Sequence, residues 1–323
     1  MAHHIRIYEQ GPPSVLSYEQ LPAIIGAPGP GQVRLRHDAI GLNFVDTMFR
    51  DGTFRVPMPF KMGVEGAGVV EAVGPGVAGL KAGDRVAYFF SFGAYSDVRL
   101  IEAQALVKLP HDVSTEQAAT LITKGLTAGM LLTRVHTVQP GETVLVHGAA
   151  GGVGALLTHW AKALGATVIA TVGSPSKAAE VRSHGIQHVL NSGDPALATL
   201  VRGITGGRGV DVVYELVGKA TFEHSVAALR NGGHLVHAGN ASGQPVVDQA
   251  ALAARSIRYD QPSTAQYVNS RASLEEATSE LFTAFRQGVF GEIKASRYPL
   301  SDVVRAHEDI AARRISGPAI LTP

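Results

Sequence analysis

The chain has 323 residues, enough for two domains of ordinary size. Its 28 Lys and Arg residues nearly balance 27 Asp and Glu residues, and the formal net charge of +1 argues against nucleic acid or an anionic membrane as a partner. Cysteine is absent, which excludes disulfides, thiolate nucleophiles and cysteine-based metal sites. The first residues lack the apolar core of a secretory signal, so we expect a cytoplasmic protein.

The first 120 residues are expected to form a mostly-β domain. Alternating apolar and polar residues, separated by turns rich in Gly and Pro, predict short strands. These strands are expected at residues 5–8, 33–36, 69–73 and 85–88. The pattern changes near residue 115, where Ser114 is followed three residues later by Gln117 before an apolar run. This spacing predicts the start of a helix.

From Thr143 onward, strands and helices alternate. Strands are expected at residues 143–147, 167–172, 188–190, 210–214 and 234–238, and helices at 155–164, at 176–184 and between the later strands. Apolar strands that alternate with helices predict a parallel sheet covered on both faces, which places the chain in the α/β class. We therefore expect residues 123–263 to form the second domain.

The last part of the chain does not continue this alternation. Helices are expected at residues 267–287 and 301–314, followed by a short strand at 319–321. The sequence therefore predicts that the chain returns to its first domain, which would comprise residues 1–122 and 264–323.

The segment from Val146 to Ala155 is the most informative motif. It follows a predicted strand and precedes a predicted helix, as a dinucleotide-binding turn must. It departs from the pattern G-x-G-x-x-G because Ala149 stands at the first position. Gly151 would let the backbone approach a pyrophosphate, and Gly154 would let the helix pack against the strand. The alternative is a tight turn without a ligand, which the regular alternation around it argues against.

The segment after the second strand of this domain favours NADPH over NADH. An NAD site usually carries an acidic residue about 20 positions after the glycines, and residues 170–177 contain none. Ser174 and Lys177 could instead bind a 2′-phosphate by a hydrogen bond and an ion pair. The alternative is that Lys177 is a solvated helix residue.

Further motifs are spread over the whole chain. They are Gly41–Asp46, Gly63–Gly68, Ala82–Val86, Lys124–Thr127, Ala149–Gly154, Trp160–Lys162, Gly239–Gly243 and Tyr298–Leu300. In this order the chain resembles the zinc-free quinone oxidoreductases, the zeta-crystallin-like group of the medium-chain dehydrogenase/reductase superfamily. Zinc-dependent relatives would have Cys in place of Asn43 and His in place of Val64, so the resemblance implies no metal.

The resemblance implies a Rossmann doubly wound parallel sheet plus a GroES-like mostly-β domain, with NADPH in the cleft between them. It also implies a set of cofactor contacts. These are Asn43 at the nicotinamide ribose, Thr127 near the phosphate bridge, Gly151, Gly152 and Val153 beneath the pyrophosphate, Gly173, Ser174 and Lys177 around the 2′-phosphate, and Val217, Gly239 and Asn240 along the nicotinamide half. Ser192 stands where a Tyr commonly packs on the 2′-phosphate ribose, and Arg314, rather than Arg313, is expected at the 2′-phosphate.

The expected substrate positions depart from the family pattern. Met48 and Phe54 stand where the family often has Tyr, which implies a more apolar pocket without two phenol hydroxyls. Asn43, Asp46 and Lys124 are the polar residues expected nearest the reacting atoms. The alternative roles are structural, with Asp46 holding the loop and Lys124 exposed to solvent.

The expected activity is hydride transfer from NADPH to a quinone, where orientation and exclusion of water supply most of the catalysis. An enone or 2-alkenal reductase is the first alternative, and the missing tyrosine hydroxyls argue against it because enone reduction benefits from a positioned acid. A low-turnover NADPH-binding protein with a structural or RNA-binding role is the second, although aromatic residues for base stacking are only 6% of the chain. The third is a reductase module of a polyketide synthase. The resemblance also implies a homodimer.

Overall fold

The computed structural model describes residues 1–22 and 25–323, and the chain divides into two compact units. The first unit comprises Met1–Lys124, Ser270–Phe282 and Ile293–Pro323, and the second comprises Gly125–Asn269 and Thr283–Glu292. Each unit has its own sheets and its own core, so each is described by itself. The domain bounds expected from the sequence, at residues 122 and 264, stay a prediction.

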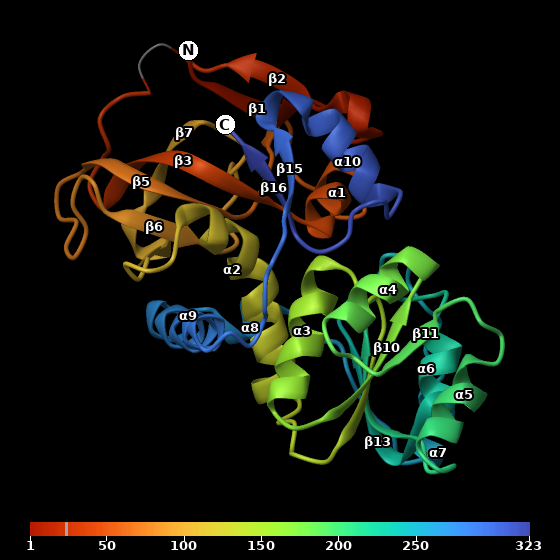
Figure 1. Ribbon diagram of the computed structural model, residues 1–323. Coiled ribbons are helices and arrows are strands. Elements are labelled where there is room, and N and C mark those ends of the chain that lie inside the picture. Colours follow the sequence, from red (N-terminus) through yellow and green to blue (C-terminus); the bar gives the residue numbers. More distant parts are fainter. Residues whose placement is uncertain (23–24) are drawn as a thin grey trace. The chain divides into compact units, whose positions relative to one another are not determined.

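The first unit is built mainly from strands (Figure 1). Its larger sheet has the order β15-β16-β3-β5-β6-β8, with β7 also paired to β3. The strands of this sheet are β3 (Gln32–Leu42), β5 (Gly66–Val73), β6 (Arg85–Tyr88), β7 (Val98–Glu102), β8 (Leu106–Lys108), β15 (Ser296–Pro299) and β16 (Ala319–Thr322). A smaller antiparallel sheet has the order β2-β1-β4, formed by β1 (His3–Ile7), β2 (Ser17–Gln20) and β4 (Phe60–Lys61). The predicted mostly-β domain is confirmed.

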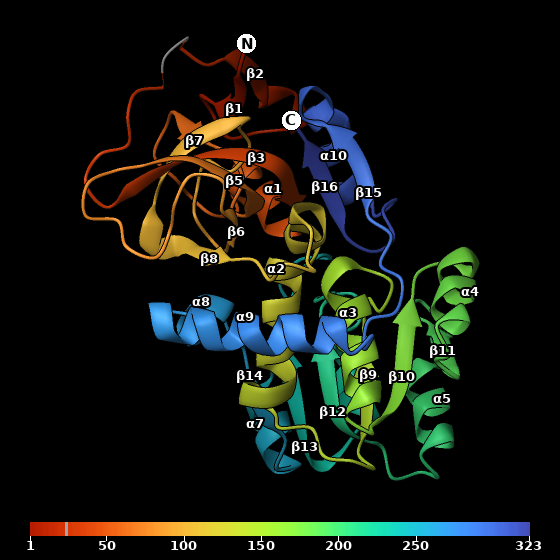
Figure 2. The ribbon, with the colours of Figure 1, turned by 60° about the vertical axis from the view of Figure 1, so that its left-hand side comes forward.

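The C-terminal strand lies beside an early strand of the same unit. β16 pairs antiparallel with β3, with Ala319 opposite Leu42, and Figure 2 shows β16 beside β3, with β15 on the other side of β16. Apolar residues of both ends of the chain therefore share one core, which includes Ile5, Leu35, Ile40, Val86 and Leu321. The helices assigned at least in part to this unit are α1 (Phe44–Asp51), α2 (Thr115–Met130), α9 (Arg271–Arg286) and α10 (Val303–Ala311), of which α2 and α9 continue into the second unit.

The second unit contains a parallel sheet with the order β11-β10-β9-β12-β13-β14. Its strands are β9 (Thr143–Val146), β10 (Thr167–Val172), β11 (His188–Asn191), β12 (Val210–Glu215), β13 (Leu229–His237) and β14 (Arg258–Asp260). The helices between them are α3 (Gly152–Ala163), α4 (Pro175–Ser183), α5 (Leu197–Ile204), α6 (Phe222–Ala228) and α7 (Gln249–Ala254), followed by the short α8 (Thr264–Tyr267). The strand order reverses at β9, which is the switch point of a doubly wound sheet, so the predicted fold is confirmed.

Hydrogen bonds of side chains near the N-termini set where two helices begin. The sequence located the first of these starts correctly and placed the second too early. The Ser114 hydroxyl accepts the Gln117 amide N–H at 3.1 Å, and the Gln117 side chain accepts the Ser114 N–H at 2.8 Å, so the expected helix start is confirmed. The helix expected over 267–287 begins later than predicted, because α8 ends at Tyr267 and α9 spans Arg271–Arg286. The backbone N–H groups of Ser270 and Ser273 donate to each other's hydroxyls, which caps a new helix there.

The helix expected over 301–314 is shorter than the sequence predicted. It ends at Ala311, and Arg313 has a φ of 56°, a left-handed conformation that no helix continues through. No helix in the described ranges is both long and apolar enough to cross a membrane.

Candidate active site

The first group of candidate residues lies at the start of α1. Asn43 precedes the helix and Asp46 is its third residue. The backbone N–H of Asn43 donates to Asp46 Oδ2 at 2.9 Å, so a carboxylate side chain closes the N-terminal turn of the helix. Both side chains are buried. The sequence therefore folds here into a turn that fixes both polar groups inside the unit.

Lys124 joins this group from α2. Its ammonium lies 2.7 Å from Glu65 Oε1 and 2.9 Å from Asn43 Oδ1, and its side chain is 5% exposed. The Asn43 amide Nδ2 donates to Glu65 Oε1 at 2.7 Å, and the backbone N–H of Thr123 donates to Glu65 Oε2 at 2.9 Å. The alternative of a solvated Lys124 is therefore wrong, since its charge is buried against a carboxylate.

Glu65 needs space beside β3, and Gly41 provides it. A β-carbon at position 41 would lie 2.0 Å from Glu65 Oε1. The glycine in the motif Gly41–Asp46 is thus explained by close approach rather than by a turn. Sequence reasoning did not assign a role to Glu65, although a carboxylate inside the apolar, glycine-rich segment 63–68 was a signal for a buried partner of a cation.

Asp46 has a second partner, Tyr95, which the sequence analysis also missed. The Tyr95 hydroxyl donates to Asp46 Oδ2 at 2.9 Å, and His307 Nε2 lies 3.2 Å from the same hydroxyl. Burial raises the pKa of Asp46 to about 7, against the opposing effect of the hydrogen bonds from Asn43 and Tyr95. Burial lowers the pKa of His307 to about 3, and the nearby charge of Arg50 acts in the same direction. These contacts fit a residue that holds the loop, the structural alternative for Asp46.

The second group of candidates forms the glycine turn of the second unit. The turn begins at Gly148, whose φ is 67°, and Gly151 caps the N-terminus of α3. A β-carbon at Gly154 would lie 2.2 Å from the carbonyl oxygen of Gly148. The predicted strand–turn–helix context is therefore confirmed. The first N–H groups of α3, which include those of Gly152 and Val153, point along the helix axis toward the turn, where an anion is stabilised.

The predicted 2′-phosphate residues gather at the carboxyl ends of β10 and β11. Val172 and Asn191 are paired in the sheet, so Gly173 and Ser192 follow side by side. A β-carbon at Gly173 would lie 3.9 Å from Ser192 Oγ. Ser174 caps α4, and its hydroxyl accepts the N–H of Lys177 at 3.4 Å. The structure therefore brings all four residues to one edge of the sheet, with Lys177 half-buried in the first turn of α4.

The predicted nicotinamide residues gather at the ends of β12 and β13. Val217 lies against the glycine turn, because a β-carbon at Gly148 would be 3.5 Å from Val217 Cγ2. A β-carbon at Gly218 would lie 3.3 Å from the carbonyl oxygen of Gly239 and 3.2 Å from Asn240 Cα. The structure thus places the three predicted residues on adjoining turns.

Two residues that the sequence analysis missed hold these turns. Glu215 Oε1 accepts the backbone N–H groups of Val217 and Gly218 at 2.8 and 2.9 Å. His237 Nε2 lies 2.8 Å from Asn240 Oδ1, and His237 Nδ1 lies 2.9 Å from the Tyr259 hydroxyl. Glu215 and His237 end the apolar strands β12 and β13, and a polar residue at the carboxyl end of a parallel strand was the available signal.

The remaining predicted residues lie as follows. Thr127 Oγ1 is 3.0 Å from Thr264 Oγ1 within the second unit. Met48 and Phe54 lie at the end of α1 and just after it, where the Met48 carbonyl accepts the Phe54 N–H at 2.9 Å. Arg314 belongs to the first unit and pairs with Asp309 at 2.6 Å. That Arg314 reaches a 2′-phosphate stays a prediction.

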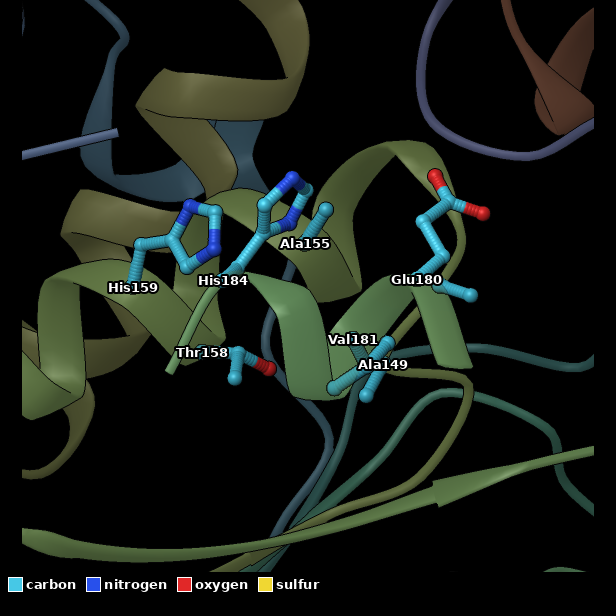
Figure 3. Close-up of a pocket in the computed structure, with 8 residues that line it drawn as sticks. Ala149, Ala155, Thr158, His159, Glu180, Val181 and His184 are labelled. Atoms are coloured by element: carbon cyan, nitrogen blue, oxygen red, sulfur yellow. The ribbon is translucent and has the colours of Figure 1, made fainter. Parts of the chain in front are cut away.

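A small pocket lies behind the glycine turn, between α3 and α4 (Figure 3). His159 and His184 meet there with ring centroids 5.0 Å apart, and Glu180 stands nearby. Burial lowers the pKa of His159, and His184 acts in the same direction. Glu180 also lines this space, so a carboxyl group and two imidazoles share the pocket.

The second unit thus carries a glycine turn of the dinucleotide-binding type, and the first unit carries a buried polar network. Together these features define a two-unit dehydrogenase fold, and the comparison with known proteins supports this class. Residues 29–111 match the family described as alcohol dehydrogenase GroES-like domain, and residues 152–282 match that described as zinc-binding dehydrogenase. A quinone oxidoreductase of Pseudomonas aeruginosa is 41% identical, with 100% of each chain covered. A 2-haloacrylate reductase of a Burkholderia species is 40% identical, with 98% of each chain covered. The structure of Escherichia coli quinone oxidoreductase complexed with NADPH superimposes with a TM-score of 0.95 at 39% identity, covering 99% of this chain and 100% of that one.

The chain belongs to the quinone oxidoreductase family of the medium-chain dehydrogenase/reductase superfamily. Its residues do not fit the zinc ion that one of the matching descriptions names. Asn43 and Val64 occupy the two positions at which the resemblance implies zinc ligands in zinc-dependent relatives, and neither provides a thiolate or imidazole ligand. Lys124 adds a buried positive charge to the same network, which repels a cation. Among the described residues, no cluster of three or more acidic or histidine side chains could hold a metal.

Proposed function

We propose that the protein is an NADPH-dependent reductase whose acceptor is a quinone. The observation that carries the proposal is the edge of the second unit's sheet, where the glycine turn, the turn after β12 and the β10–α4 turn come together around the switch point. Support for the acceptor comes from relatives about 40% identical that are described as quinone oxidoreductases.

The residues at this edge fit NADPH. Gly151 and Gly173 have no side chain that would fill the space over the turns. Segment 170–177 contains no acidic residue that would bind a free ribose hydroxyl. Ser174 and Lys177 in this segment therefore favour a 2′-phosphate. When bound, NADPH supplies a hydride, which carries two electrons and one proton. Val217, Gly239 and Asn240 would hold the nicotinamide half, with the Asn240 amide oriented by His237.

On the first unit, the buried network orients Asn43. Its Oδ1 is held by Lys124 and one Nδ2 hydrogen by Glu65, and these bonds leave the second Nδ2 hydrogen for a ribose hydroxyl. Lys124 and Asp46 therefore act as positioning residues in this proposal. A quinone becomes a hydroquinone by gaining two electrons and two protons, and the proton that does not arrive as hydride is taken from water. Water suffices because conjugation stabilises the reduced quinone anion.

A reductase of an activated C=C bond is the second candidate, and the relative described as 2-haloacrylate reductase favours it. Such a reaction requires a proton at the α-carbon and benefits from a positioned acid. Asp46, with its raised pKa, is a carboxyl that can hold a proton near neutral pH, but both of its strong contacts are to the protein itself.

The test is the loss of absorbance at 340 nm with purified protein, with NADPH or NADH against a quinone, an enone and 2-chloroacrylate. We expect rapid oxidation of NADPH with the quinone and slower oxidation of NADH. Turnover of the enone or the haloacrylate without turnover of the quinone would favour the second candidate. Binding of NADPH without oxidation by any acceptor would favour a low-turnover binding protein. Sedimentation of the same sample tests the proposed homodimer.

A further inference from the structure

Glu215, the last residue of β12, joins the two turns that are expected to hold the nicotinamide half of the cofactor. Its side chain accepts the backbone N–H groups of Val217 and Gly218 at 2.8 and 2.9 Å. Its main-chain carbonyl accepts the N–H groups of Ala238 and Gly239 at 2.9 and 3.1 Å. One residue therefore links the turn after β12 to the turn after β13.

The Glu215 side chain is fully buried, and hydrogen-bond donors surround both of its oxygens. Besides the two backbone N–H groups, the Thr221 hydroxyl donates to Oε1 at 2.8 Å and the Ser225 hydroxyl donates to Oε2 at 2.5 Å. Such bonds compensate for the water that a carboxylate loses on burial. All four donors are uncharged groups, so they spread the negative charge but do not cancel it.

In the part of the chain that the structure describes, no Lys or Arg forms an ion pair with Glu215. The imidazole of His147 lies nearby, with Nε2 3.9 Å from Glu215 Oε2. Burial lowers the pKa of His147 from 6.5, Glu215 opposes this effect, and His224 adds to it. An imidazole with such a pKa is mainly neutral at neutral pH. Lys219 is close in sequence but exposed, so water screens its charge.

The carboxylate lies where the expected cofactor turns meet. His147 directly precedes Gly148, at which the glycine turn begins. A β-carbon at Gly148 would lie 3.5 Å from Val217 Cγ2, so the glycine turn and the turn after β12 are in contact. Glu215 borders both of them, through its approach to His147 and its bond to the Val217 N–H.

The nicotinamide ring changes its charge in the proposed reaction. The ring is neutral in NADPH and positive in NADP+, because the hydride leaves with both electrons of its bond. A buried carboxylate without a cation favours a positive ring nearby, since Coulomb attraction is weakly screened away from water.

We propose that Glu215 is a positioning residue of the nicotinamide subsite and that its negative charge makes this subsite prefer NADP+ over NADPH, which favours hydride donation. The inference rests on the proposed function. It adds to that function a residue and an electrostatic role for the second unit.

The test compares the dissociation constants of NADPH, NADP+ and 2′,5′-ADP for wild type and Glu215→Gln by titration calorimetry. Gln keeps an oxygen that accepts the N–H groups of Val217 and Gly218, and it removes the charge. We expect Kd for NADP+ to rise about tenfold and Kd for NADPH to rise only about twofold. Because 2′,5′-ADP has no nicotinamide, its Kd should stay unchanged.

Asp211→Asn is the matched control on the same strand. Asp211 is also buried, but its carboxylate pairs with Arg208 and Arg230 at 2.6 and 2.7 Å. It stands four residues before Glu215 in β12, roughly 13 Å along a strand, so its loss should not change the ratio of the two Kd values. Glu215→Asp keeps the charge and should restore the preference for NADP+ even where it weakens all binding.

The outcomes separate this inference from the proposed function. If the wild type binds neither NADPH nor NADP+, the proposed function fails. If it binds both, the inference alone is overturned when Glu215→Gln leaves the Kd ratio unchanged, weakens all three ligands equally, or shifts the ratio no more than Asp211→Asn does. Should Glu215→Gln fail to fold, the wild type still decides, because the inference requires NADP+ to bind at least about threefold more tightly than NADPH.

Discussion

The two units hold their candidate site residues in different ways. In the first unit, charged side chains from distant segments are buried against one another, as in the contact of Lys124 with Glu65 and Asn43. In the second, the glycine turn is shaped by backbone contacts within a few residues, such as the close approach of Gly154 to Gly148. The first arrangement depends on charge balance and therefore on pH. The second depends on steric fit and is insensitive to charge.

Removal of one partner of the buried ion pair is expected to have the largest effect. Lys124→Met leaves Glu65 buried without its cation, and such a loss destabilises a protein by about 4 kcal/mol. Urea unfolding followed by circular dichroism measures it. The double variant Lys124→Met/Glu65→Gln removes the uncompensated charge and should recover a large part of that stability. A double variant no more stable than the single one would contradict the charge-balance explanation.

The carboxyl of Asp46 should make the first unit sensitive to rising pH. Its pKa in the folded protein is about 7, raised by burial from 3.8, so between these values the folded state holds a proton that the unfolded state has released. The stability that this proton provides is complete below about pH 4 and is lost as the pH rises through 7, by up to about 4 kcal/mol.

Asp46→Asn tests this pH dependence. The Asn side chain resembles the protonated carboxyl and can accept the same hydrogen bonds from Asn43 and Tyr95. We expect the variant to match the wild type near pH 4 and to exceed its stability at pH 8, measured as urea midpoints across that range. Parallel curves for the two proteins would show that Asp46 is charged in the folded state at neutral pH.

Gly154→Ala tests the steric arrangement of the second unit. The new β-carbon would lie 2.2 Å from a backbone oxygen, which cannot move without opening the turn, and we expect a loss of about 3 kcal/mol together with weaker NADPH binding. Gly203→Ala is the control, because a β-carbon there meets nothing within 4 Å in α5 and should stabilise the helix by about 0.5–1 kcal/mol. Equal effects of the two substitutions would remove the case for a close approach at Gly154.

The same difference explains what could be predicted from the sequence. The glycine turn, the parallel sheet and the residues at its carboxyl edge were predictable because their signals are local in the chain. The partners in the first unit were not, since Glu65, Tyr95 and His307 come from separate segments and none belongs to a motif with fixed spacing. The ring contacts of Phe49 with Phe54, Phe60 and Phe92 were missed for the same reason, because they depend on how α1, β4 and the segment after β6 pack.

Lys177→Ala is expected to have the smallest effect and addresses cofactor choice rather than stability. Loss of one partly exposed cation at a phosphate should raise KM for NADPH about tenfold, which corresponds to about 1.4 kcal/mol, and leave KM for NADH nearly unchanged. The cap of α4 should be kept, because the Ser174 hydroxyl accepts the backbone N–H of residue 177 whatever its side chain. Lys162→Ala on α3 is the matched control, as an exposed lysine of the same unit whose ammonium binds the Gly185 carbonyl at 3.0 Å. A rise in KM for both cofactors would place Lys177 at the pyrophosphate, and no rise for either would make it the solvated helix residue of the alternative interpretation.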